Sequence, residues 1–302
     1  MAQDLRFGIL ILPDTPWPEV LERTERYETA GLDSVWVADH FVHYANPTGP
    51  WLECWTLLAG LATRTSRIRL GPLVSHGIYR NPAVLARQAM TVDRLSGGRL
   101  ELGLGTGASD HDWRIACGQE PWPFAERVER FGEAVEIVDR LLRGETTTYL
   151  GRYYGVADAT LQPGPSQRPR PPLTVAASGA RMVRVAARYA DVWITEGNYR
   201  ELWGRTATAV DVLRLTRERG ELLSEEAAAL GREPGAIRRA FLAGFSPGLE
   251  APWASVDALQ DFIGRYREIG CSVFVLPEPN VGETALFERI AQDVIPALRQ
   301  GA

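Results

Sequence analysis

The chain has 302 residues, of which 45% are hydrophobic and 24% charged, a composition typical of a soluble globular protein with a large core. Its 33 basic and 38 acidic side chains leave a net charge of −5, which argues against a basic nucleic-acid-binding surface. No apolar run reaches the roughly 18 residues of a membrane span, and residues 7–12 lack the cationic start of a secretory signal, so we expect a cytoplasmic protein with no membrane partner.

Short runs rich in β-branched and aromatic residues alternate along the chain with longer amphipathic stretches. We expect strands at residues 7–12, 34–38, 68–74, 100–105, 173–177, 192–195, 237–245 and 273–277. We expect helices at residues 18–29, 54–63, 82–95, 124–142, 181–189, 199–218, 255–269 and 284–299. Residues 144–172 interrupt this alternation with a predicted hairpin at 146–154 and a proline-rich stretch, and we interpret them as an insertion.

This α/β alternation is compatible with a closed (β/α)8 TIM-like barrel or with a doubly wound open sheet. Polar residues just after the predicted strands favour the barrel, because catalytic residues collect at the carboxyl ends of barrel strands. We therefore expect one barrel domain over residues 1–302. The polar residues just after the predicted strands include all four histidines. These polar residues are Asp39, His40, His43, Ser75, His76, Thr106, His111, Ser178, Glu196 and Glu278.

Lysine is absent, so all 33 basic residues are arginine. Because a guanidinium does not deprotonate near neutral pH, this excludes Schiff-base aldolases, pyridoxal-phosphate enzymes and P-loop NTPases. The cysteines, Cys54, Cys117 and Cys271, are widely spaced and form no CxxC pair. They fit a reducing compartment and argue against a disulfide or zinc framework.

A carboxylate beside an imidazole, Asp39-His40, ends the apolar second strand where a cleft would open. A histidine at such a place is a natural proton shuttle near neutral pH. Two alternatives stay open. Asp39 could be a buried residue that caps the next turn, or Asp39, His40, His43 and Glu278 could hold a metal ion in a barrel hydrolase, although neither HxH nor HExxH is present.

Two glycine-containing turns are candidates for cofactor binding. Residues 103–108 match GxGxx[GA] after a strand, but no apolar helix follows directly, so these glycines favour contact with a flat ligand over a dinucleotide site. Ala177-Ser178-Gly179-Ala180 joins the fifth strand to a helix, an arrangement that points free backbone N–H groups at a phosphate. A simple N-cap serine is the alternative.

Residues 31–41, GLDSVWVADHF, resemble a segment of the bacterial luciferase-like monooxygenase family, and residues 53–71, 80–105 and 171–193 resemble further segments of it. The resemblance covers roughly residues 5–200. It implies a TIM-like barrel that binds reduced FMN, or the 5-deazaflavin coenzyme F-420 (F420), at the carboxyl rim, often in a homodimer. The order of the motifs is most similar to the branch that uses the deazaflavin.

The resemblance also implies roles for individual residues. His40 matches the histidine that gives or takes a proton beside the flavin ring, with Asp39 next to it. Leu73-Val74 matches the part of the third strand where family members often hold a non-proline cis peptide against the ring. Thr106 and Gly107 match positions that contact the ring or its tail, and Ser178, Gly179 and Ala180, with Ala177 before them, match the phosphate-binding turn.

One departure from the family concerns the substrate. The sugar-phosphate dehydrogenases of this family have a glutamate where this chain has Ala108 and an asparagine where it has His111, and the absence of lysine removes the basic residues that grip a sugar phosphate. We expect an oxidoreductase in which F420 exchanges a hydride with a small organic substrate while His40 moves the accompanying proton. An FMN-dependent monooxygenase that uses dioxygen is one alternative, and a non-catalytic flavin-binding relative is another. Candidates for the substrate pocket are His43, His76, His111, Trp193 and Glu196.

Overall fold

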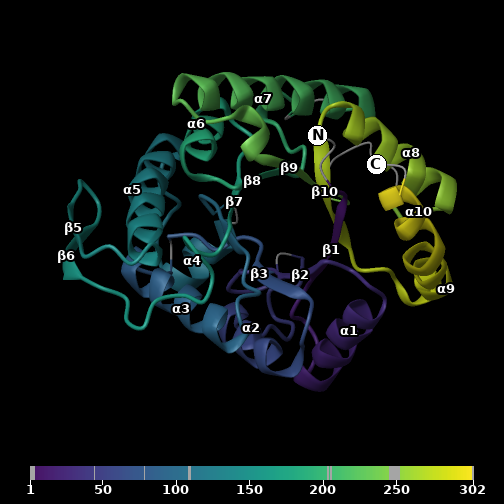
Figure 1. The fold of residues 1–302 in the computed structure, drawn as a ribbon, viewed down its shortest axis with the longest axis horizontal. Coiled ribbons are helices and arrows are strands. Elements are labelled where there is room, and N and C mark those ends of the chain that lie inside the picture. The colour runs from purple at the N-terminus through teal and green to yellow at the C-terminus, as the bar shows by residue number, and fades with distance from the viewer. Residues whose placement is uncertain are drawn as a thin grey trace. The chain divides into compact units, whose positions relative to one another are not determined.

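A computed structural model describes residues 4–43, 45–77, 79–107, 110–202, 204, 206–244 and 252–300 (Figure 1). Its strands are β1 (Arg6–Ile11), β2 (Ser34–Val37), β3 (Arg69–Pro72), β4 (Leu102–Leu104), β5 (Thr147–Leu150), β6 (Gly155–Ala159), β7 (Leu173–Ala176), β8 (Val192–Thr195), β9 (Arg238–Leu242) and β10 (Cys271–Pro277). Its α-helices are α1 (Trp17–Thr29), α2 (Cys54–Arg64), α3 (Pro82–Leu95), α4 (Asp110–Cys117), α5 (Phe124–Leu142), α6 (Ala180–Tyr189), α7 (Ala209–Ala229), α8 (Val256–Glu268), α9 (Thr284–Arg289) and α10 (Ile295–Gln300). Short helical turns are η1 (Arg200–Leu202), η2 (Pro234–Ala236), η3 (Val281–Glu283) and the π-helical η4 (Ile290–Val294).

Eight of the strands form one sheet in the order β3-β2-β1-β10-β9-β8-β7-β4. The two ends of this order are also joined to each other, because Ser75 N–H donates to Gly103 O at 2.9 Å and Gly105 N–H donates to Ser75 O at 2.9 Å. Parallel bridges between Leu70 and Leu100 and between Ser75 and Leu104 follow the same path. The strands therefore have the cyclic connectivity of a (β/α)8 TIM-like barrel, which confirms the predicted fold class.

The chain forms two compact units, one from the described residues of 1–10, 26–35 and 175–302 and the other from those of 11–25 and 36–174. The prediction of a single domain over residues 1–302 stays a prediction. In the first unit, α6 packs against α7 (Figure 1). The core of this unit contains aromatic rings from β9, α8 and β10. The ring centroids of Phe241 and Tyr266 lie 4.1 Å apart, and those of Phe262 and Phe274 lie 6.0 Å apart.

In the second unit, α3 packs against α2 and α5. The guanidinium of Arg99 ties the end of α2 to the start of β3, because it donates to the carbonyl oxygens of Ala62, Thr65 and Ile68 at 2.7–2.9 Å. A planar group with several N–H donors suits such a turn, where a lysine ammonium would make fewer directed bonds. Arg99 thus fixes the geometry from which the third strand begins.

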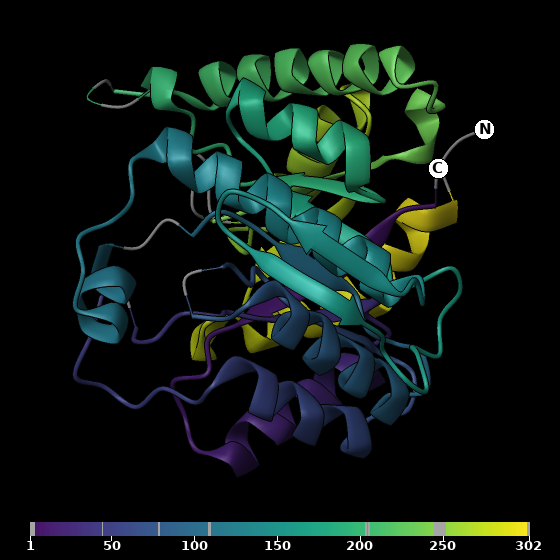
Figure 2. The ribbon, with the colours of Figure 1, turned by 90° about the vertical axis from the view of Figure 1, so that its left-hand side faces the viewer.

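The predicted insertion at residues 144–172 is present. It contains the antiparallel hairpin β5–β6, which contacts α5 and faces the viewer in Figure 2. Its far end is anchored by Asp93, a fully buried residue of α3. The carboxylate of Asp93 accepts hydrogen bonds from Ser166 N–H at 2.6 Å, Gln167 N–H at 3.0 Å and Gln167 Nε2 at 2.7 Å.

Two predicted helices differ from the structure, and one helix of the structure was not predicted. The helix expected at residues 199–218 begins only at Ala209 and continues to Ala229, because Thr208 and Asp211 form a reciprocal capping box that defines its start. The helix expected at residues 284–299 is interrupted by the π-helical η4. The short helix α4 was not predicted. Among the described residues, no helix combines the length and the apolar character that a bilayer crossing requires.

Candidate active site

Asp39 lies at the end of β2 in the second unit and is 2% exposed. Arg80 donates to both of its carboxylate oxygens, at 2.8 and 3.1 Å, and Ser75 Oγ donates to Oδ2 at 2.5 Å. Trp55 Nε1 in turn donates to Ser75 Oγ at 2.8 Å, and Arg80 also pairs with Glu53 at 2.6 Å. Burial lowers the pKa of Arg80, but the charge and hydrogen bonds of Asp39 and Glu53 raise it by more, so the guanidinium stays charged. Asp39 therefore holds together the ends of β2 and β3.

His40 makes its side-chain bond with another carboxylate. Its Nδ1 lies 2.6 Å from Oδ2 of Asp112 in α4, while 30% of the His40 side chain is exposed and Asp112 is 1% exposed. Phe41 N–H donates to Asp112 Oδ1 at 2.8 Å. Burial raises the pKa of Asp112, but hydrogen bonds from His40, Tyr79 and Phe41 and the charge of His40 outweigh it, so the pKa is lowered. Asp112 was not among the predicted site residues, although it follows the fourth strand closely, as the predicted rim residues do.

His76 is 3% exposed, and neither of its ring nitrogens has a hydrogen-bond partner within the described part of the chain. Its ring centroid lies 4.6 Å from that of Tyr79. Burial lowers the pKa of His76 to about 4, against smaller raising effects of Asp39 and Asp112, so the ring is neutral at pH 7. Two buried polar atoms without partners are unusual, and a bound polar group can satisfy them.

His43 lies in the loop after β2, where its Nδ1 accepts hydrogen bonds from the N–H groups of Ala45 and Asn46, both at 3.0 Å. Its ring packs edge to face on Trp51, with centroids 5.4 Å apart. Trp51 Nε1 donates to the carbonyl oxygen of His40 at 2.7 Å. The structure therefore brings His43 near His40 through Trp51. The Nδ1 atom of His43 holds the loop together.

The third and fourth strands supply the residues predicted to contact a flavin ring. The peptide bond between Leu73 and Val74 is a non-proline cis bond, as the family resemblance implies. Leu73 N–H donates to Val37 O at 2.8 Å, which places this bond beside the end of β2. Thr106 and Gly107 follow β4, and Gly107 adopts a φ of 75° while its carbonyl oxygen accepts from Arg127 Nη1 at 3.0 Å. Ala108 lies outside the described residues, as does the side chain of His111 in α4.

The predicted phosphate-binding turn lies in the first unit, between β7 and α6. β7 ends at Ala176, and Ala177 follows it. Helix α6 begins at Ala180 with Gly179 as its N-cap residue, which makes no side-chain capping bond. The Oγ of Ser178 instead lies 3.3 Å from Thr195 Oγ1, so the alternative in which Ser178 caps the helix is wrong. A Cβ at Gly179 would meet no atom within 4 Å. The side of Gly179 on which a Cβ would lie is therefore open, and no side chain caps the first amides of α6, so an anion could take that place.

An arginine missed by the sequence interpretation lies beside this turn. Arg219 Nε donates to the carbonyl oxygen of Ser178 at 3.1 Å, and its guanidinium also pairs with Glu201. Trp193 is fully buried, and its Nε1 donates to Ala177 O at 2.7 Å, so it supports the strand that ends at the turn. Glu196 follows β8 at the same end.

The residues of the metal-site alternative are engaged elsewhere. Asp39 binds Arg80, His40 binds Asp112, and Glu278 accepts from Tyr27 Oη at 3.0 Å in the first unit. Among the described residues, no group of three histidine, cysteine, aspartate or glutamate side chains could hold an ion. The geometry therefore does not favour the barrel hydrolase.

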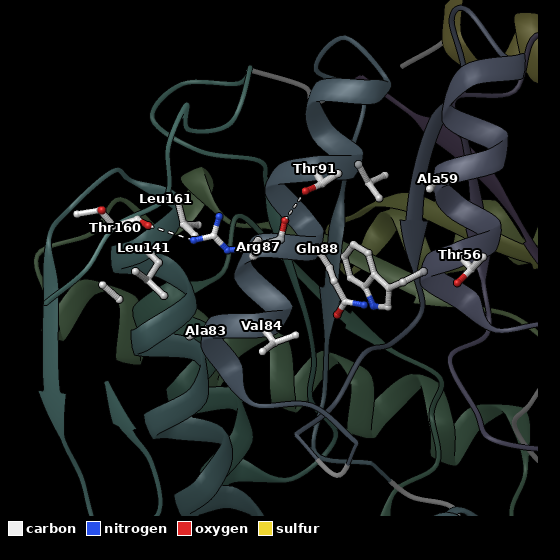
Figure 3. Close-up of a pocket in the computed structure, with 13 residues that line it drawn as sticks. Thr56, Ala59, Ala83, Val84, Arg87, Gln88, Thr91, Leu141, Thr160 and Leu161 are labelled. Atoms are coloured by element: carbon white, nitrogen blue, oxygen red, sulfur yellow. Dashed lines mark hydrogen bonds between the residues drawn. The ribbon is translucent and has the colours of Figure 1, made fainter. Parts of the chain in front are cut away.

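A cavity of about 550 Å³ opens between α2, α3, α5 and the end of the hairpin (Figure 3). Apolar side chains such as Val84, Leu141 and Leu161 make up most of its lining. Arg87 Nη2 donates to Thr160 O at 3.3 Å across one side of it. None of the described lining residues is a predicted site residue, and only Trp55, through its bond to Ser75, links this cavity to Asp39.

Comparison with known proteins shows one relationship over nearly the whole chain. The family model for luciferase-like monooxygenases matches residues 5–272. The chain is 31% identical to the F420-dependent glucose-6-phosphate dehydrogenase of Intrasporangium calvum, over 93% of this chain and 95% of that protein. It is 30% identical to the enzyme of the same name from Beutenbergia cavernae, over 93% of each chain.

Solved structures with the same fold include an F420-dependent secondary alcohol dehydrogenase in complex with an F420–acetone adduct. The TM-score is 0.81, and the match covers 98% of this chain and 99% of that one at 20% sequence identity. At this identity the likeness supports the barrel fold.

Proposed function

This chain belongs to the luciferase-like monooxygenase family, and we propose that it is an F420-dependent oxidoreductase that exchanges a hydride with a small organic substrate, with His40 as the proton donor or acceptor. The observation that carries the proposal is the environment of His40. A partly exposed imidazole, bonded through one nitrogen to a buried carboxylate, stands at the end of a barrel strand. The F420-dependent relatives support the choice of coenzyme.

The residues present fit such a coenzyme. The bare N-terminus of α6 at Ser178, Gly179 and Ala180 would hold its phosphate, and Arg219 adds a positive charge beside this turn. In the second unit, Leu73, Val74, Thr106 and Gly107 would contact its ring or tail. The two unpartnered nitrogens of His76 offer a donor and an acceptor to a polar group of the coenzyme or the substrate.

When bound, F420 supplies a carbon that accepts or returns a hydride. The chain must supply the matching proton transfer. If an alcohol is oxidised, His40 takes the hydroxyl proton as the carbonyl forms; in the reverse direction it gives a proton to the carbonyl oxygen. Asp39 acts as a positioning residue, because its oxygens are held by Arg80 and Ser75 and fix the strand end that presents His40.

The proposed substrate is a small alcohol or the corresponding carbonyl compound. A sugar phosphate is disfavoured, because the family resemblance places Ala108 where the sugar-phosphate dehydrogenases carry a glutamate. His43, His111, Trp193 and Glu196 remain candidates for the substrate pocket, and His76 could serve there too. We further propose a homodimer in the cytoplasm; sedimentation at micromolar concentration tests the dimer.

Titration of the purified protein with F420 and with FMN, followed by absorbance, tests the proposal. We expect saturable binding of F420 and, with a panel of small secondary alcohols, bleaching of its visible absorption as the coenzyme is reduced. Binding of FMN alone, with oxygen consumption after reduction, would instead assign an FMN-dependent monooxygenase. If the protein binds neither F420 nor FMN, the proposal is refuted.

A further inference from the structure

Helix α4 places Asp112 against the loop that carries His40. The pair is 2.6 Å apart between Nδ1 and Oδ2. We infer that Asp112 is a positioning residue that keeps the Nδ1–H tautomer of His40, so that Nε2 is the atom that exchanges a proton with the substrate. The assignment of Nε2 to the substrate rests on the proposed function, whereas the tautomer is a property of the protein alone.

The tautomer follows from what Asp112 can accept. Asp112 is 1% exposed, and its lowered pKa keeps it ionised, so it is an acceptor only. Its Oδ1 accepts from Phe41 N–H, and the hydroxyl of Tyr79 also donates to it. A bond of 2.6 Å between Asp112 Oδ2 and Nδ1 therefore requires a proton on Nδ1. In the neutral ring, the lone pair is then on Nε2.

Asp39 cannot perform this role, although it is adjacent to His40 in sequence. Arg80 and Ser75 occupy both of its oxygens. The carbonyl oxygen of His40 accepts from Trp51, which restrains the backbone that carries the ring. Within the described part of the chain, Nε2 of His40 makes no hydrogen bond that would compete with a substrate hydroxyl.

The proton transfer then balances in both directions. In alcohol oxidation, the substrate O–H bond breaks, an N–H bond forms at Nε2, and the carbon-bound hydrogen leaves with its electron pair to the coenzyme. The resulting imidazolium carries a proton on each nitrogen, and its positive charge lies beside the carboxylate of Asp112. In carbonyl reduction, Nε2–H returns its proton to the oxygen. The lone pair of the other tautomer would face Asp112, where it could not accept the substrate proton.

Nitrogen NMR of the full-length protein tests the tautomer directly. The chain has four histidines, so ¹⁵N-histidine labelling gives few ring signals, and His40→Gln identifies those of His40. Spectra are recorded without coenzyme over a pH series, and the tautomer is assigned at the alkaline end of the series. We expect Nδ1 of His40 to be the protonated nitrogen. A neutral wild-type ring protonated at Nε2 would overturn the inference, and this measurement requires no Asp112 variant to fold.

Two variants connect the tautomer to turnover. Asp112→Asn should shift the His40 ring toward Nε2–H and lower kcat on the order of 10²- to 10⁴-fold, since a similar loss follows when a catalytic histidine takes the wrong tautomer. Asp112→Glu should retain part of the Nδ1–H population of His40 and part of the wild-type kcat. Glu120→Gln is the matched control. Glu120 lies just after α4, and its exposed carboxylate pairs with Arg114 of that helix. This substitution should leave kcat within about twofold.

The outcomes separate this inference from the proposed function. An Nδ1–H ring in a protein that binds no F420 would confirm the tautomer and reject the function. If F420 is used but Asp112→Asn leaves kcat unchanged, or lowers it with an unchanged His40 tautomer, the positioning role is overturned and the function stands.

Discussion

Asp39 and His40 are adjacent in sequence, yet their side chains belong to two separate hydrogen-bond networks. Asp39 is bonded to Arg80 and Ser75, which come from the segment between β3 and α3. His40 is bonded to Asp112, which comes from α4. The first network is buried and fixes the strand ends, whereas the second leaves the imidazole partly exposed. Substitutions in the two networks should therefore have different effects.

His40→Ala should lower kcat about a hundredfold or more, because the reaction loses its proton donor and acceptor. The dissociation constant for F420 should change little, since the phosphate turn is untouched. Stopped-flow absorbance gives kcat, and quenching of coenzyme fluorescence gives the affinity. Glu120→Gln, which removes the exposed carboxylate that pairs with Arg114, is the control and should keep most of the activity. An active His40→Ala enzyme would refute the assignment.

Asp39→Asn should lower the free energy of unfolding by about 3 kcal/mol. The substitution leaves the charge of Arg80 beside an amide in a site where both side chains are at most 10% exposed. Glu218→Gln, which removes the exposed pair with Arg214, should cost less than about 0.5 kcal/mol. Urea unfolding followed by circular dichroism measures both. Equal losses in the two variants would show that the Asp39 pair behaves as a surface pair.

The stability of the protein should fall as the pH drops from about 7 to 5 because of His76. Its pKa of about 4 in the folded chain lies below the ordinary value of 6.5, so the folded state binds fewer protons than the unfolded state between these values. The contribution to stability is fully present above pH 6.5 and is lost as the pH falls toward 4. The loss reaches about 2 kcal/mol by pH 5. The charged groups near His76 are Asp39, Asp112, His40 and Arg80.

Unfolding free energies at pH 7 and 5 should differ less in His76→Asn than in the wild type. Thr63→Ala, which changes an exposed residue with no titratable group, is the control and should keep the wild-type slope. If His76→Asn shows the same pH dependence as the wild type, another group causes it.

Gly179→Asp should change stability and coenzyme affinity in opposite directions. A carboxylate at the bare N-cap of α6 can bond its free amides, which should add about 0.5 kcal/mol to stability. The same charge would repel the coenzyme phosphate and weaken F420 binding about tenfold. Gly179→Asn, which caps without charge, should keep most of the affinity. Thermal unfolding and F420 titration measure the two effects. Unchanged affinity in Gly179→Asp would place the phosphate elsewhere.

Gly103→Ala should destabilise the protein by about 3 kcal/mol, because the new Cβ would clash with the carbonyl oxygen of Pro72 in the neighbouring strand. The matched control is Gly132→Ala in α5, where a Cβ meets no atom within 4 Å. This change should stabilise the protein by about 0.5–1 kcal/mol, because alanine is the better helix former. Comparable stability of the two variants would contradict the close approach of the strands.

The sequence was informative wherever a local signal determined the structure. The eight barrel strands were found because each is a short apolar run followed by a helix, and His40 was found because it ends such a run. The start of α7 was missed although Thr208 and Asp211 had the spacing of a capping box. The capping signal is local, so the sequence alone carries the start of this helix.

The partner of His40 was not predictable in the same way. Asp112 lies 72 positions away, and its contact depends on how α4 packs against the loop after β2. The pairing of Asp39 with Arg80, 41 positions away, depends likewise on the path from β3 to α3. Sequence patterns show which residues reach the strand ends, whereas the choice of partner among several carboxylates is made by tertiary packing.

The three bonds that Asp93 accepts from Ser166 and Gln167 lie just before β7. Together with the bond from Arg170 to Asp139, they hold the chain in place just before it re-enters the sheet. Insertions of different length between α5 and the bonds of Asp93 should therefore be interchangeable without shifting β7. Hairpin β5–β6 is accordingly the place at which a foreign loop could be grafted to alter the enzyme while leaving its scaffold in register.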